Sequence, residues 1–153
     1  MKKKLKGIFA ALAVAFLLLQ LTNPARTNPP VVHDMIASNQ PPAEVAAMLR
    51  ASCYDCHTHE TTWPFYSRIA PSSWLVVGDV NEGRQHLNLS DWPQDPERAA
   101  KKCERMSEAV EDGDMPPGKY TMIHVNARLT DAQKKQLTQW LDDRADQLKA
   151  AAK

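Results

Sequence analysis

A cysteine pair followed by a histidine is the first place in the chain where residue types and spacing could do chemistry. Cys53, Cys56 and His57 form the pattern C-x-x-C-H. Two thiols three residues apart can each form a thioether with one vinyl group of a single porphyrin, and the histidine after them can donate a nitrogen to the iron. The pattern therefore predicts one covalently attached haem c, held by Cys53 and Cys56, with His57 as an axial ligand.

Other uses of the cysteine pair require features that the rest of the sequence does not supply. A zinc site needs two more ligands at regular spacing, and nothing beyond Cys103 and scattered histidines offers them. A thioredoxin-like redox pair belongs to a β-α-β unit, which the sequence does not suggest. A plain disulfide between Cys53 and Cys56 leaves His57 without a role. These uses remain alternatives to haem attachment.

A methionine in a later loop is the expected ligand on the other side of the iron. Met115 lies in the segment "EDGDMPPGKY", where two prolines stiffen the loop after it. Ligation by histidine and methionine raises the reduction potential and suits electron transfer. His59 is too close to His57 to reach the opposite face of the ring. The rivals of Met115 for this position are Met106, Met122, His86 and His124.

The segment after the motif is rich in side chains that could surround a porphyrin. Aromatic rings pack against apolar faces and exclude water, and guanidinium groups bind carboxylates such as haem propionates. The aromatic candidates are Trp63, Phe65, Tyr66, Trp74 and Trp92, and the arginine candidates are Arg68 and Arg84. Ordinary core rings and surface arginines would give the same pattern, so both interpretations stay open.

The elements that must position these residues are helices. Helical periodicity covers the segments 41–53, 71–87 and 95–114, and a last stretch that starts near residue 130 and runs to residue 148. Asp95 is the expected N-cap of the third helix and Gly113 its stop signal, while Thr130 and Gln133 form a capping box for the last. No stretch alternates with period two, so we expect an all-α domain over residues 42–150.

The third of these helices places the remaining cysteine on its apolar face. Cys103 shares that face with Ala99, Met106 and Val110. We expect Cys103 to be a buried, inert thiol. A disulfide would need a free partner, and haem attachment leaves none within the chain.

The chain begins with the pattern of an export signal. Four lysines precede an apolar run from Gly7 to Leu21, which is shorter than the roughly 20 residues of a comfortable transmembrane helix. The flank "QLTNPAR" is a poor cleavage site, so we expect residues 1–22 to be an uncleaved signal anchor. The alternative is a signal peptide that leaves a soluble periplasmic protein starting near Arg26. The prolines of residues 23–41 predict an extended spacer that holds the domain off the membrane.

Charge and topology together predict on which side of the membrane the domain lies and exclude nucleic acid as a partner. Residues 1–25 carry four of the 19 basic side chains and none of the 18 acidic ones, so the remainder has a net charge of −3. A mildly acidic body has no electrostatic footprint for nucleic acid. The lysines should stay in the cytoplasm, which places the domain on the periplasmic side of a bacterial inner membrane.

The motif and its flanks resemble the bacterial haem-binding domain family of small exported, cytochrome c-like monohaem proteins. The resemblance covers about residues 22–142, from the lead-in "ARTNPP" through "CYDCHTHETTWPFYSRIAPSSWLVVGDVNEGRQHLNLSDW" to "GDMPPGKY", "HVNARLTDAQ" and "LTQWL". Its specific parts are the W-P-x-Y-S segment at 63–67 and the G-R…L-N-x-S-x-W segment at 83–92. One departure is Leu89, where the family commonly has an aromatic residue.

The resemblance implies a cytochrome c-like helical fold around one haem, with Cys53 and Cys56 as attachment points, His57 as axial ligand and Met115 as the expected second ligand. We therefore expect a single-electron carrier that serves an unidentified redox partner protein, and not an enzyme. The alternative is a haem-based sensor or gas-binding module with an open or weakly ligated distal site. A peroxidase would need an acid–base group at an open distal site, and no constellation points to one.

Overall fold

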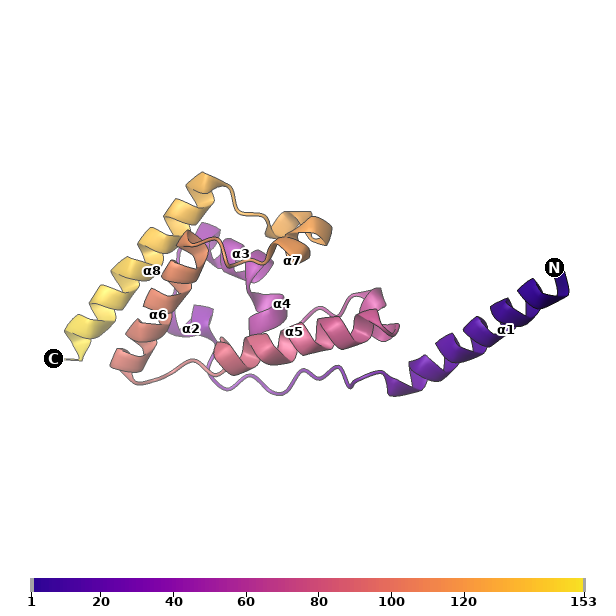
Figure 1. The fold of residues 1–153 in the computed structure, drawn as a ribbon. Coiled ribbons are helices and arrows are strands. Elements are labelled where there is room, and N and C mark those ends of the chain that lie inside the picture. The colour runs from indigo at the N-terminus through magenta and orange to yellow at the C-terminus, as the bar shows by residue number, and fades with distance from the viewer. Residues whose placement is uncertain (1, 153) are drawn as a thin grey trace.

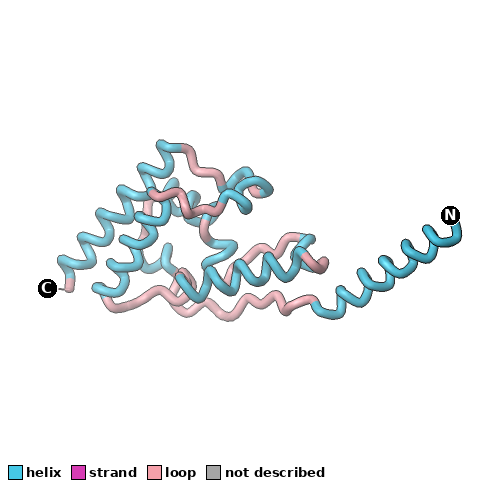
Figure 2. Tube along the Cα trace, in the orientation of Figure 1, coloured by secondary structure: helices cyan, strands magenta, loops and turns pink. Residues whose placement is uncertain are grey.

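The computed structural model describes residues 2–152 and shows an all-α protein, as the sequence predicts (Figures 1 and 2). Within these residues no strand forms, and one isolated bridge joins His33 to Asp91. The α-helices are α1 (Lys2–Leu19), α2 (Met35–Asn39), α3 (Ala43–Ser52), α4 (Tyr54–His57), α5 (Ser72–His86), α6 (Pro96–Glu111), α7 (Gly118–Ile123) and α8 (Asp131–Ala151). Three short 3₁₀ helices are η1 (Gln20–Thr22), η2 (Phe65–Arg68) and η3 (Val125–Ala127).

The pair α6 and α8 forms one side of the domain, and local capping fixes where both helices begin. The Asp95 side chain accepts a hydrogen bond from the Arg98 amide at 2.9 Å, which confirms the predicted N-cap of α6. Gly113, just beyond α6, has a φ of 79°, a conformation that glycine adopts without strain. The capping box between Thr130 and Gln133 is present at the start of α8.

The hydrophobic core lies between α6, α8 and α3. Leu137, Leu141 and Ala145 of α8 are buried, while Trp140 and Leu148 are partly buried against the same cluster. Cys103 of α6 has no exposed surface, which confirms the expected buried thiol. Burial of this apolar face, rather than helix propensity, supplies most of the stability of such a pair.

The motif helix α4 follows α3 almost directly and packs against α5. A glycine permits this close packing, because a Cβ added at Gly83 would lie 2.7 Å from the carbonyl oxygen of Cys56. The backbone of α5 therefore approaches the C-x-x-C-H turn more closely than any other residue type at position 83 would allow.

Helix α1 extends away from the domain, and the chain after it returns along the domain surface (Figure 1). The helical stretch Lys2–Thr22 is unburied and, by length and composition, apolar enough to cross a membrane. Residues 23–34 are extended, but they bond to the domain through contacts such as Asn28 Nδ2 to the Thr61 carbonyl at 2.9 Å. Met35 is fully buried in the core. Packing against the domain thus starts within the segment that we expected to stand away as a spacer.

Candidate functional site

His57 is held in one orientation by two backbone carbonyls. Its Nδ1 lies 3.0 Å from the Gly83 oxygen and 2.9 Å from the Leu87 oxygen. Because both partners can only accept, Nδ1 carries the proton and Nε2 keeps its lone pair. The side chain is buried, and burial lowers its pKa, which favours the neutral ring that binds a metal.

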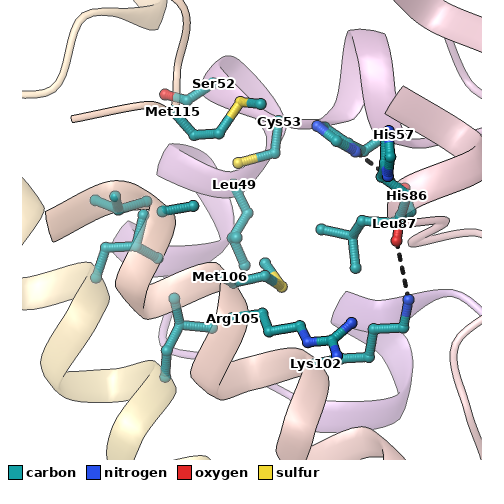
Figure 3. A pocket seen from close by; sticks show the side chains of 14 residues that line it. Leu49, Ser52, Cys53, His57, His86, Leu87, Lys102, Arg105, Met106 and Met115 are labelled. Carbon is teal, nitrogen blue, oxygen red and sulfur yellow. Dashed lines mark hydrogen bonds between the residues drawn. The ribbon is translucent and has the colours of Figure 1, made fainter. Parts of the chain in front are cut away.

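His57 faces a cavity of about 280 Å³ between the motif, α3, α6 and α8 (Figure 3). Cys53 and Met115 line the same cavity, so the structure brings three of the four predicted site residues to one place. The loop that carries Met115 is fixed by a bond from its amide to the Ala109 carbonyl at 3.0 Å. Apolar side chains form most of the remaining wall: Leu49, Leu87, Met106, Ala109, Val110, Leu137 and Leu141.

Two cationic side chains of α6 line this cavity and were not among the predicted site residues. Lys102 and Arg105 lie at one end of the cavity in Figure 3, whereas Cys53 and Met115 lie at the other. The Lys102 ammonium also donates to the His86 carbonyl at 3.1 Å. The two cations are three residues apart, so they occupy one side of the helix, bordering its apolar face. The position of these two cations beside the apolar face was the feature of the sequence that could have marked them as site residues.

The fourth predicted residue, Cys56, lines a neighbouring cavity of about 240 Å³. Burial is the main cause of a raised pKa at both motif thiols, to about 12 at Cys53 and about 11 at Cys56. Both thiols are therefore protonated near neutral pH, and neither has formed a disulfide.

A polar cluster forms part of the wall of this second cavity. The Tyr120 hydroxyl donates to the Asp55 carboxylate at 2.9 Å, and the Tyr66 hydroxyl lies 2.7 Å from Nε2 of His124. The Tyr120 and His124 rings stack with centroids 4.2 Å apart. His124 is thus engaged beside Cys56 and does not line the cavity that His57 faces.

The structure also places His59 and the remaining rivals for the second ligand position. Both ring nitrogens of His59 have partners, the Pro30 carbonyl and the Asn88 amide, each at 2.9 Å. Met122 is 76% exposed and lines neither of these two cavities. Met106 and His86 do line the first cavity. Residues 2–152 contain no group of three or more His, Cys, Asp or Glu side chains placed to hold a metal ion.

The aromatic and arginine candidates mostly have other roles. Arg84 donates to the carbonyls of Thr58 and Thr27 at 2.7 and 2.8 Å, so its guanidinium ties chain segments together. Trp92 is buried in the core, whereas Phe65 and Trp74 are exposed. Of the aromatic candidates only Tyr66 lines one of the two cavities.

Comparison with known proteins identifies the family of the chain. The model of the haem-binding domain family matches residues 14–143. No curated protein and no solved structure matches the chain. The family match spans most of the sequence and includes the motif and the residues that line both cavities. The chain therefore belongs to the haem-binding domain family, and the cofactor that it binds is haem.

Proposed function

We propose that the protein is an exported c-type cytochrome that carries single electrons, with one haem attached through Cys53 and Cys56 and ligated by His57 and Met115. The observation that carries the proposal is the cavity that His57 and Met115 share. The two carbonyls that bind Nδ1 of His57 leave Nε2 as the ligand atom. The Met115 thioether is the soft ligand that completes an electron-transfer site.

The positions of the two cavities are consistent with a porphyrin that is bonded to two cysteines. A porphyrin bonded to both thiols must contact the cavity of Cys53 and that of Cys56. The vinyl and propionate groups lie on opposite edges of haem, and Lys102 and Arg105 lie at the end of the first cavity away from Cys53 (Figure 3). We assign these two cations to the propionates, which guanidinium and ammonium groups bind well.

Haem supplies one-electron chemistry, and the chain sets its environment. The wall of the first cavity is mostly apolar, and with both His57 and Met115 bound the iron would have no open position for a substrate. We therefore propose that the protein is an electron carrier and not an enzyme. Residues 1–22 anchor it to the periplasmic side of a bacterial inner membrane, where it exchanges electrons with a partner protein.

The test is the absorption spectrum of the protein matured with a c-type haem system. We expect a far-red ferric band from the methionine–iron bond, and its loss in Met115→Ala. Met122→Ala is the matched control, because this exposed methionine lines neither cavity and should keep the band. Denatured protein should retain haem mass, and the double substitution of Cys53 and Cys56 by alanine should abolish covalent retention.

Each part of the proposal can fail separately. Haem that stays covalently bound without both motif cysteines would contradict the attachment. A band that survives Met115→Ala would contradict methionine ligation. A wild-type protein that lacks the band and binds carbon monoxide in the reduced state would favour the sensor or gas-binding alternative.

A further inference from the structure

The face of the domain next to the end of α1 carries a cluster of exposed apolar side chains, which we name the apolar rim. The rim consists of Phe65, Ile69, Trp74, Leu75 and Ile123. Phe65 and Leu75 expose 76% and 71% of their surface. η2 packs against the start of α5, and Leu75 and Ile123 line the same cavity, so the rim joins three elements. Gathered apolar exposure of this kind marks a contact surface.

Hydrogen bonds fix the rim to the end of α1. The Gln20 side chain bonds to the Ala70 backbone in both directions, accepting from its amide at 2.9 Å and donating to its carbonyl at 3.3 Å. The Trp74 indole donates to the Thr22 carbonyl at 3.2 Å. The rim therefore lies level with residues 20–22, where the apolar run of α1 ends.

If α1 spans a bilayer, the bilayer surface would lie at the level of residues 20–22. An 18-residue window within Lys2–Thr22 has a mean hydropathy of 2.0 and is unburied, so lipid is the environment its side chains suit. Tryptophan is enriched at membrane–water interfaces because its ring is apolar and its N–H needs a polar partner. Trp74 meets both conditions beside the end of the helix.

The charge of the rim segment also suits lipid. Residues 61–78 contain no acidic side chain and one basic one, Arg68, which is exposed. An arginine beside apolar side chains can bind lipid phosphates while those side chains enter the interface. Charged α8 lies on the other side of the domain from α1 (Figure 1).

We propose that the apolar rim inserts into the interfacial region of the bilayer that holds α1, so that the domain docks on the membrane surface. This inference rests on one part of the proposed function, the retention of residues 1–22 as an anchor. Docking gives the haem domain a fixed height and orientation. Its redox partner must then reach the haem at the membrane surface.

Spin labelling of the full-length, haem-loaded protein in vesicles of phosphatidylethanolamine and phosphatidylglycerol tests the docking. The label is placed at Phe65→Cys, which lines neither cavity, with Ala150→Cys at the far end of α8 as the control. Power saturation compares collisions with oxygen, which enters lipid, and with a nickel chelate, which stays in water. We expect the oxygen-to-nickel ratio to be several-fold higher at position 65 than at position 150. Ile69→Cys is a second rim site that lines neither cavity, and an unchanged haem spectrum verifies folding.

The outcomes separate the anchor from the docking. Mass spectrometry of the vesicle-bound chain shows whether residues 1–22 remain, and their loss would overturn the anchor and the docking together. An intact chain with equal ratios at positions 65 and 150 would overturn docking alone.

Discussion

At the scale of single residues, Cys103 differs from the two cysteines that haem would use, because it is a buried structural thiol. Its side chain has no exposed surface, and burial raises its pKa from 9.0 to about 11. At pH 8 this shift lowers the thiolate fraction about 100-fold, because each pKa unit is a factor of ten. Unlike Cys53 and Cys56, it lines neither of the two cavities.

Thiol counting of the haem-loaded protein follows from this placement. We expect no thiol to react with a thiol-specific reagent at pH 8 in the native state, and one to react after unfolding in urea. Cys103→Ala should show none in either state, which identifies the reactive residue. Rapid labelling of the native protein would contradict the buried position, and three reactive thiols after unfolding would contradict haem attachment.

At the scale of elements, the site depends on how closely α5 approaches α4. The Gly83 and Leu87 carbonyls hold His57, and the backbone at Gly83 lies against Cys56. A methyl group at position 83 would meet the Cys56 carbonyl oxygen at 2.7 Å and force the two helices apart. The orientation of His57 and the position of the thiol would then shift together.

Gly83→Ala should therefore destabilise the haem-loaded protein by about 1–3 kcal/mol, as overpacking of a tight contact does. Urea unfolding monitored by haem absorbance measures the change. Gly78→Ala lies in the same helix with nothing within 4 Å of the added methyl, so it should be neutral or stabilise by up to about 1 kcal/mol. Equal effects of the two substitutions would show that the contact is unimportant.

The same elements show which features could be predicted from the sequence. The starts of α6 and α8 depend on the side chains of Asp95 and Thr130 and on residues within one turn, so local pattern was sufficient. Cys53, Cys56 and His57 are also local in sequence. The place of Lys102 and Arg105 in the cavity depends on how α6 faces α4, which is set by packing between distant segments. The role of Gly83 could not be predicted from the sequence for the same reason.

At the scale of the whole molecule, one arginine connects the N-terminal segment to the site. Arg84 donates to Thr27 and Asn28 of that segment, at 2.8 and 3.0 Å. It also donates to Thr58 and Thr61 after the motif, at 2.7 and 2.9 Å. Prolines predicted an extended backbone over residues 23–41, of which 23–34 is extended while Met35–Asn39 forms α2. No local pattern showed that a residue of α5 would bind this segment. Hydrogen bonds of Arg84, as well as the covalent chain, thereby hold the N-terminal segment to the domain.

Arg84→Gln should release this segment and expose the bond after Arg26 to trypsin. Losing two of these hydrogen bonds, at about 1 kcal/mol each, raises the open population by roughly 30-fold, and cleavage follows that population when reclosing is fast. Mass spectrometry of a timed digest measures cleavage after Arg26, with Arg98→Gln as the control, because that exposed arginine lies at the start of α6. An unchanged cleavage rate in Arg84→Gln would show that backbone contacts, such as that of the Met35 amide with the Leu89 carbonyl at 2.8 Å, hold the segment without the arginine.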